Sequence, residues 1–411
     1  MKKSVSPKGK AAPKGTVIDA AALLASRKHH PKPAAGRSFG TDRLPAGFQT
    51  IIDPQKNPPQ PWRDLPSATG PAPYHLSLDS VLSAEAMQSI ETSGRLVFHA
   101  VGDTGGVNTP TYIENVANYM EADFSGNDIT THPSFFYHLG DVVYYEGELG
   151  NYFPEFYEPY MNYPAPIFAI PGNHDGDVDP QTKESSLEGF VRNFCSQIPG
   201  HTPEAGDATR STMTQPNVYW TLLTPLVTVI GLYSNCPEGG QLSPAQIAWF
   251  ETELKQAPDD RALIVAVHHP IYSAYGPKPG SQHLYGVLDT AVQSAGRLPE
   301  LVLSGHVHDY QRFTGALNGK DIPIIVAGAG GYNKQLHTLA KIFHNSKLPI
   351  SMTGSTGQLE NFNDSQHGYL RITVTKKNLL CEYIAVPDTS SPKAGPLKPF
   401  DSLTIPTPQY A

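Results

Sequence analysis

The sequence predicts an α/β protein in which helices cover a mainly parallel or mixed sheet and a second sheet stacks on the first. Short β-branched or aromatic runs end repeatedly at Gly-Asp, Gly-Asn, His-His or Gly-His, as buried strands do where they enter loops. A helical pattern separates some of these runs, which is typical of α/β folds. The last apolar runs have no strong helix between them, which indicates an antiparallel part and a sandwich of two sheets.

The predicted elements follow in chain order. Buried strands are expected at residues 96–101, 135–139, 167–170, 263–267 and 301–304. A helix is expected at 244–256, because Ser243 suits the N-cap, Pro244 suits the first turn, and Phe250 and Leu254 can share one face with other apolar side chains. The antiparallel part is expected from the runs at 322–327, 369–374 and 379–385.

The ends of the chain differ from this pattern. Residues 1–40 are rich in Lys, Pro, Ala and Ser and predict a disordered basic tail. Residues 41–94 carry many prolines and predict an extended strap over the core. The catalytic domain is expected at 95–386, and a Pro-rich C-terminal tail or second strap at 387–411.

Charge and composition narrow the function classes. The net charge of the 411 residues is −8, which gives no general case for nucleic-acid binding, and we expect no sequence-specific nucleic-acid partner. The basic tail is a candidate to contact an anionic surface, with a merely solvated tail as the alternative. Three distant cysteines argue against a disulfide framework, and no apolar stretch is long enough to cross a membrane. With no export signal visible, a cytoplasmic protein is expected.

Polar clusters follow the predicted strands. They are Gly102-Asp103-Thr104-Gly105-Gly106, Gly140-Asp141-Val142-Val143-Tyr144, Gly172-Asn173-His174-Asp175, Val265-Ala266-Val267-His268 and Gly305-His306-Val307-His308. Polar residues at the carboxyl ends of strands are where α/β sheets place their sites. Oxygen donors and imidazoles in this number exceed the needs of one metal ion. They suit two ions about 3.5 to 4 Å apart that share a carboxylate, an arrangement used to hydrolyse phosphate esters.

This ordered set of motifs, GDxG, GDxxY, GNHD, VxxH and GHxH, resembles the calcineurin-like metallophosphoesterases and, within them, the purple acid phosphatase branch in its compact single-domain form. Most of that superfamily has an Asp-x-His motif where this chain has Gly105, and this chain instead places Tyr144 three residues after Asp141. The exchange of His for Tyr is characteristic of the branch. The resemblance implies a two-sheet β-sandwich flanked by helices, with a binuclear metal centre at one edge.

The resemblance also implies the ligands of two metal ions. The first ion would be held by Asp103, Asp141, Tyr144 and His308, and the second by Asp141, Asn173, His268 and His306. Asp141 would bridge them. Two carboxylates and a phenolate favour iron as Fe(III), whereas an amide oxygen with two imidazoles suits Zn(II), Mn(II) or Fe(II), that is zinc, manganese or ferrous iron.

Substrate contacts are less well defined by the sequence. His174 is expected to bind the phosphate or to protonate the leaving alkoxide, and Asp175 either orients His174 or is a simple turn carboxylate. Family members place a His on the loop after the VxxH strand, where this chain has residues 273–277, so either Tyr275 or His283 is expected to contact substrate. His269 is expected beside the metal ligands and not among them.

The predicted function is hydrolysis of a small phosphorylated substrate, a monoester above all, by metal-activated hydroxide. Two alternatives stay open. The same site would serve a phosphodiesterase or pyrophosphatase with a different pocket shape. A non-catalytic scaffold would instead hold phosphate on the backbone amides of Gly105 and Gly106.

Overall fold

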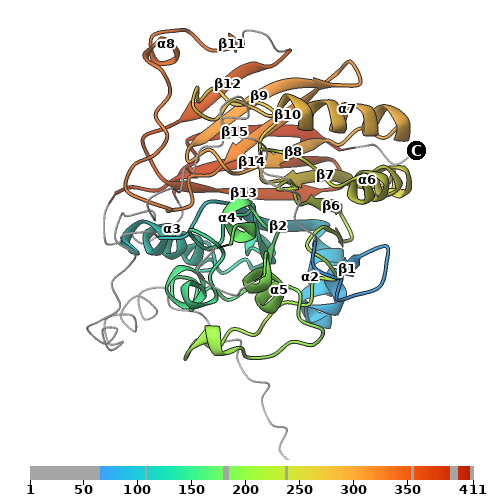
Figure 1. Cartoon of the computed structure of the whole chain (residues 1–411), viewed down its shortest axis with the longest axis vertical. Coiled ribbons are helices and arrows are strands. Elements are labelled where there is room, and N and C mark those ends of the chain that lie inside the picture. Colours follow the sequence, from blue (N-terminus) through green and yellow to red (C-terminus); the bar gives the residue numbers. More distant parts are fainter. Residues whose placement is uncertain are drawn as a thin grey trace, which may run out of the picture.

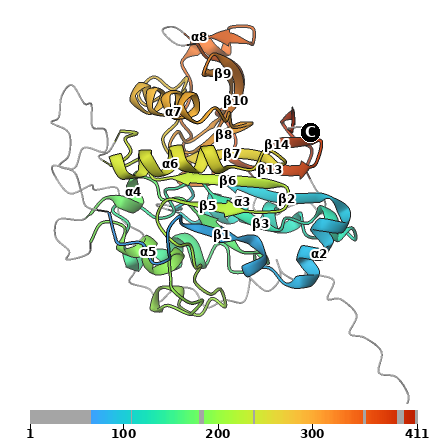
Figure 2. The same ribbon diagram turned by 90° about the vertical axis from the view of Figure 1, so that its right-hand side faces the viewer.

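The computed structural model describes residues 65–106, 109–178, 185–236, 239–352, 356–388 and 397–407. Two mixed sheets stack as a sandwich, with helices against their outer faces (Figures 1 and 2). The predicted fold class, α/β with a two-sheet sandwich, is therefore confirmed. The predicted basic tail at 1–40 and residues 41–64 of the predicted strap lie outside the described residues.

The larger sheet has nine strands in the order β1-β5-β6-β7-β8-β10-β9-β12-β11. Neighbouring strands from β6 to β10 run parallel, and β9, β10, β11 and β12 pair antiparallel. The strands are β1 (His75–Ser77), β5 (Trp220–Leu223), β6 (Val227–Leu232), β7 (Ala262–Val267), β8 (Leu301–Ser304), β9 (Tyr310–Leu317), β10 (Lys320–Ala327), β11 (Ile350–Ser351) and β12 (Gln358–Asn363).

The smaller sheet has six strands in the order β15-β14-β13-β2-β3-β4. Its strands β2, β3 and β4 are parallel, and β13, β14 and β15 form the antiparallel part. The strands are β2 (Arg95–Val101), β3 (Phe135–His138), β4 (Ile167–Ala169), β13 (Gly368–Thr375), β14 (Asn378–Ala385) and β15 (Asp401–Pro406). The predicted antiparallel pairing of the runs at 369–374 and 379–385 is confirmed.

Helices cover the outer faces of both sheets. The α-helices are α2 (Ala84–Ser93), α3 (Thr111–Ala122), α4 (Asn173–Gly176), α5 (Glu188–Phe194), α6 (Pro244–Gln256), α7 (Gln282–Ala295) and α8 (Lys341–His344). Shorter turns are η1 (Leu78–Ser80), η2 (Ile129–Thr131), η3 (Leu149–Asn151), η4 (Phe153–Tyr157) and η5 (Pro203–Ala205). Helix α6 has the predicted bounds, and the Ser243 hydroxyl caps it by accepting the Gln246 amide at 3.1 Å. No described helix has the length and apolarity of a membrane span.

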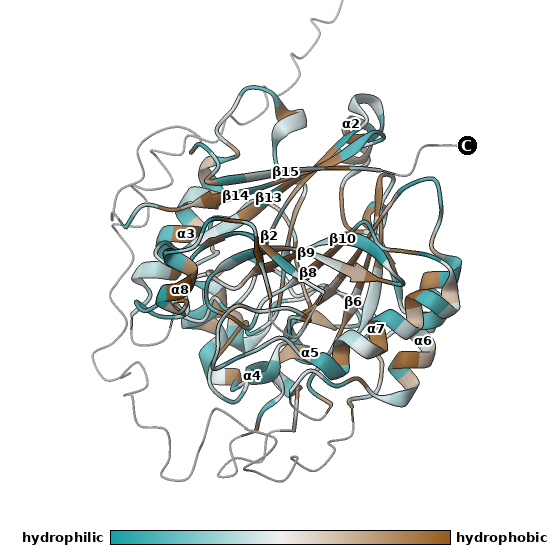
Figure 3. Ribbon diagram, turned by 90° about the horizontal axis from the view of Figure 1, so that it is seen from above, coloured by the Kyte–Doolittle hydropathy of each residue, from teal (hydrophilic) through white to brown (hydrophobic). Residues whose placement is uncertain are grey.

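The apolar core has three layers, because successive side chains of a strand point to opposite faces. Phe98 and Ala100 of β2 face the larger sheet and meet Ile264 and Ala266 of β7 between the two sheets. Val101 faces outward to α3. On the far side, α6 and α7 lie side by side against the larger sheet, and Figure 3 shows both hydrophobic and hydrophilic colours on these two helices.

The sequence predicted irregular structure in two regions where the structure has regular elements. The described part of the predicted strap includes β1 and helix α2, where Ser83 accepts the Ala86 amide as an N-cap. The predicted C-terminal tail supplies β15, which pairs with β14 as an edge strand. The three cysteines, Cys195, Cys236 and Cys381, are buried and none forms a disulfide.

Candidate metal centre

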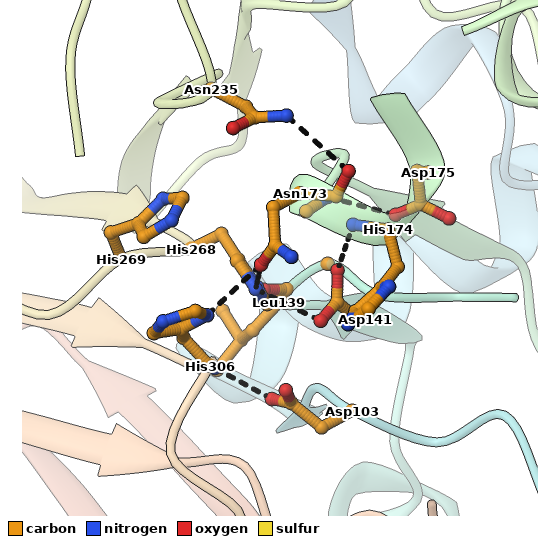
Figure 4. A network of polar contacts seen from close by, with 12 residues as sticks. Asp103, Leu139, Asp141, Asn173, His174, Asp175, Asn235, His268, His269 and His306 are labelled. Carbon is orange, nitrogen blue, oxygen red and sulfur yellow. Dashed lines mark hydrogen bonds and ion pairs between the residues drawn. The ribbon is translucent and has the colours of Figure 1, made fainter. Parts of the chain in front are cut away.

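The predicted metal ligands come from five loops that converge on one edge of the sandwich. Figure 4 shows those at Asp103, Asp141, Asn173, His268 and His306. In the smaller sheet Asp103, Asp141 and Asn173 follow β2, β3 and β4. In the larger sheet His268 follows β7, and His306 and His308 follow β8. Because the parallel strands of both sheets end at this edge, residues that are far apart in sequence meet there.

One group of ligand atoms surrounds the amide oxygen of Asn173. His268 Nε2 lies 3.2 Å and His306 Nδ1 lies 3.0 Å from Asn173 Oδ1. His268 Nε2 is also 3.2 Å from Asp141 Oδ2. Nitrogen and oxygen atoms of Asp141, His268 and His306 all lie within 4.8 Å of one another. This group matches the ligand set that the sequence assigned to the second metal.

A second group surrounds the phenol of Tyr144. Its Oη lies 3.5 Å from Asp103 Oδ1 and 3.4 Å from Asp141 Oδ2. His308 Nε2 lies 3.3 Å from the same Oδ1 of Asp103. Asp141 Oδ2 thus belongs to both groups, as a bridging carboxylate requires.

The backbone fixes which carboxylate oxygens face the cluster. The His306 amide donates to Asp103 Oδ2 at 2.7 Å, and the His174 amide donates to Asp141 Oδ1 at 2.9 Å. The other oxygen of each carboxylate is left to face the phenol and imidazoles. Asp103, Asp141 and His306 have φ of 56°, 53° and 68°, a left-handed conformation that costs energy in residues other than glycine and is concentrated at functional sites.

The electrostatics of the cluster fit bound cations. Burial above all, with the nearby charge of Asp141, raises the pKa of Asp103 to about 7. Burial and the two carboxylates also raise the pKa of the Tyr144 phenol well above its usual value. Both ring nitrogens of His308 are buried, and neither has a hydrogen-bond partner among the described residues. Metal ions would neutralise the carboxylates and occupy the orphaned imidazole, so this donor set suits them.

Two neighbouring histidines have clear structural partners. His268 Nδ1 donates to the carbonyl of Leu139 at 2.8 Å, which leaves Nε2 for the cluster. His269 Nδ1 lies 2.8 Å from the Ser234 hydroxyl, and its ring centre is 4.4 Å from that of His306. Although β7 ends at Val267, before the point assumed from the sequence, His269 still lies beside the ligands.

His174 and Asp175 lie on the short helix α4. His174 Nδ1 donates to the carbonyl of Tyr145 at 2.8 Å, and its ring packs 4.6 Å from that of Tyr144. Asp175 accepts backbone amides of Val142, Val143 and Gly172 at 2.8 to 3.3 Å. Its carboxylate thus ties together the loops after β3 and β4. These amide contacts correspond to the turn-carboxylate alternative.

The two expected substrate contacts separate in the structure. His283 is exposed in the first turn of α7, in a groove shared with Ile247 and Glu251 of α6. Tyr275 stacks on His337 with ring centres 4.3 Å apart, and His337 stacks on His308 at 4.2 Å. Only Tyr275 is therefore linked to the metal centre by described contacts.

Three residues near the cluster had escaped the sequence analysis. His337 accepts the His308 amide at Nδ1 at 2.9 Å, and its own amide donates to the His308 carbonyl at 2.9 Å. Tyr332 packs on Tyr144 with ring centres 4.3 Å apart. Lys278 donates to the carbonyl of His306 at 2.9 Å. Only Tyr332 could have been found from the sequence, because it follows the glycine-rich turn at 328–331. No neighbouring sequence pattern indicates that Lys278 or His337 lies at the site.

The fold and this site can be compared with known proteins. A family model described as calcineurin-like phosphoesterase matches residues 96–310, more than half of the chain. The chain belongs to the calcineurin-like phosphoesterase family, whose members are generally metal-dependent phosphoester hydrolases and typically bind two metal ions. A comparison with curated proteins found no similar sequence.

Solved structures share the fold at low identity. A purple acid phosphatase from yellow lupin, Lupinus luteus, is 18% identical with a TM-score of 0.51 over 75% of this chain and 53% of its own. This chain thus spans about half of the lupin enzyme. GAP50, an anchor in the inner membrane complex of Plasmodium, is 16% identical over 76% of this chain and 89% of its own, with a TM-score of 0.48. PhoD is 14% identical over 77% of this chain and 70% of its own, with a TM-score of 0.49.

Proposed function

We propose that the protein is a dinuclear metal hydrolase of phosphate monoesters that works as purple acid phosphatases do. The observation that carries this proposal is the position of the Tyr144 phenol, 3.5 Å from Asp103 and 3.4 Å from Asp141. A phenolate with two carboxylates forms a hard, anionic site that favours Fe(III). Asn173, His268 and His306 would hold Zn(II), Mn(II) or Fe(II) on the other side of Asp141.

Each nearby residue then has a chemical task. Bound cations supply Lewis acidity and a hydroxide nucleophile near neutral pH. His268 Nε2 is kept available because Leu139 holds Nδ1–H. His174 Nδ1–H is likewise held by the Tyr145 carbonyl, so Nε2 is the nitrogen that takes up a proton and donates it to the leaving oxygen.

The test combines metal analysis, a visible spectrum and activity. We expect about two metal ions per chain, as the two-ion mechanism requires, a visible charge-transfer band, and turnover of p-nitrophenyl phosphate in preference to its bis ester. Tyr144→Phe should lose the band but keep the fold. Asp141→Asn should lose most bound metal and at least about a hundredfold in activity, because it removes the shared ligand.

Other outcomes would identify the alternatives. Faster turnover of the bis ester would indicate a phosphodiesterase on the same site. Phosphate binding without turnover, unchanged when metal is removed, would indicate a scaffold. A colourless active protein that contains only zinc or manganese would remove the tyrosinate–Fe(III) assignment and leave the phosphoesterase.

A further inference from the structure

A lysine reaches the metal centre from the loop between β7 and α7. The half-buried Lys278 donates its 2.9 Å hydrogen bond to the backbone carbonyl of His306, and its side chain therefore lies beside the proposed second-metal ligand. The ammonium group is thus a close neighbour of the cluster on its His306 side.

The loop holds Lys278 in place. Its amide donates to the Tyr275 carbonyl at 3.1 Å in a turn, and Pro277 and Pro279 restrict the backbone on either side. The Ser281 amide donates to the Pro270 carbonyl at 2.8 Å and closes the base of the loop. Gln311 Oε1 accepts the Ala274 amide at 2.7 Å and anchors the loop to β9. A side chain that the surrounding loop holds in place in this way is suited to recognise a ligand.

The charge of Lys278 is unfavourable for metal binding on its own. A protonated lysine is not a metal ligand, and it repels cations held by Asp141 and His306. An anion that contacts both the cations and the ammonium group is attracted by both. An ammonium group has three N–H donors, so its bond to the His306 carbonyl is compatible with a further acceptor.

We propose that Lys278 is a specificity-determining residue that donates to a non-bridging phosphate oxygen on the His306 side of the site and so favours dianionic phosphate monoesters. This inference rests on the proposed function. A monoester carries close to two negative charges near neutral pH, whereas a diester carries one. A fixed positive charge therefore stabilises bound monoester more than bound diester.

The test uses the full chain with Lys278→Met, Lys278→Arg and, as a matched control, Lys320→Met at the exposed start of β10. Calorimetry measures Mn(II) binding to metal-free protein and inorganic phosphate binding to loaded protein. For Lys278→Met we expect phosphate affinity to fall about 10- to 100-fold, the effect of losing one charge-assisted hydrogen bond. Metal affinity should stay equal or rise, because a repulsive charge is gone. The arginine variant should keep most of the phosphate affinity.

Activity gives a second readout. The ratio of kcat/KM for p-nitrophenyl phosphate to that for its bis ester should fall about tenfold in Lys278→Met. Unchanged phosphate affinity would overturn the inference. A fall in metal affinity as large as that in phosphate affinity would also overturn it, because Lys278 would then only support the His306 backbone. If the wild type hydrolyses neither ester, the proposed function fails, while the two binding titrations still decide the role of Lys278.

Discussion

At the scale of single residues, His308 is held in an unusual way for a metal-binding histidine. Such imidazoles normally donate their second N–H to a carbonyl or carboxylate, as His268 does to Leu139. Among the described residues neither ring nitrogen of His308 has a hydrogen-bond partner, although Nε2 lies 3.3 Å from Asp103 Oδ1. Its ring instead packs 4.4 Å from that of Tyr332 and 4.2 Å from that of His337. His337 also forms two hydrogen bonds with the His308 backbone: its Nδ1 accepts the His308 amide, and its own amide donates to the His308 carbonyl.

We therefore expect His337→Ala to weaken metal binding at the Asp103 side about 10- to 100-fold, the usual cost of losing a residue that supports a ligand. His337→Phe keeps the ring stack but loses the acceptor for the His308 amide, and should recover part of the affinity. Titration of metal into protein that a chelator has stripped of metal measures the affinity of both variants. Alanine and phenylalanine variants that bind metal as the wild type does would refute this role, and exposed His344→Ala is the control.

The residues of the candidate metal centre could be picked out from the sequence because each stands in a short motif directly after a strand. The residues around them could not. Lys278 and His337 are placed by loop closures, such as the Ser281–Pro270 hydrogen bond, and by stacking between rings from distant segments. Such contacts leave no local pattern. His283 shows the converse, since its position in the sequence suggested a loop at the site and the structure has it on helix α7.

At the scale of elements, β15 joins the two sheets at a point that the sequence did not reveal. Asp401 of β15, in the smaller sheet, binds Arg312 Nε at 2.7 Å and accepts the Tyr310 hydroxyl at 2.7 Å, both from β9 of the larger sheet. The side chains of Arg312 and Asp401 are 17% and 8% exposed, so the ion pair is largely shielded from water. This part of the predicted C-terminal tail or second strap is thus a structural link.

Asp401→Ala should lower the free energy of unfolding by about 2 to 3 kcal/mol, since it leaves Arg312 and the Tyr310 hydroxyl without their partner. Urea denaturation with a constant excess of chelator measures this without metal effects. Ser402→Ala, at the exposed neighbouring position, should change the free energy by less than about 0.5 kcal/mol. Equal losses in the two variants would show that β15 does not bind the sheets together.

Strands with one dominant apolar run, such as β2, β3, β7 and β8, were predictable because both of their faces are buried. Strands β9 and β12 were not, because polar side chains alternate along them and they lie toward one edge of the larger sheet. Sheet order was also beyond sequence reasoning. β10 pairs with β8 and β9, whereas β13, the next long strand, crosses to the other sheet.

At the scale of the whole molecule, a buried polar network on the outer side of the smaller sheet should make stability depend on pH. His99 is fully buried and bonds Asp123 at 3.1 Å and the Tyr163 hydroxyl at 3.1 Å. Burial lowers the pKa of His99 despite the Asp123 carboxylate. The folded protein thus keeps this imidazole neutral, while the unfolded chain takes up its proton at a pKa of about 6.5.

This difference between the folded and unfolded states sets how the free energy of unfolding changes with pH. The contribution of neutral His99 to the free energy of unfolding is complete above about pH 6.5. It falls as the pH drops below that value, by at most about 1.4 kcal/mol per pH unit. His99→Gln should flatten that slope between about pH 6.5 and 5. Urea denaturation midpoints, recorded in excess chelator across this pH range, measure the slope. The other histidines contribute equally to the wild type and to His99→Gln, so the difference between the two slopes reports His99. An unchanged slope in His99→Gln would contradict the assignment.

The convergence of ligand loops from both sheets also has a consequence for folding. Ions held between Asp141 of the smaller sheet and His268 of the larger one would act as cross-links between the sheets, in addition to the apolar packing and polar contacts that join them. Binding to the native state alone adds stability that grows with the free ion concentration. If the proposed metal centre forms, the persistence of the fold is coupled to metal supply, and we expect a metal-starved chain to lose its chemistry and its resistance to proteolysis together.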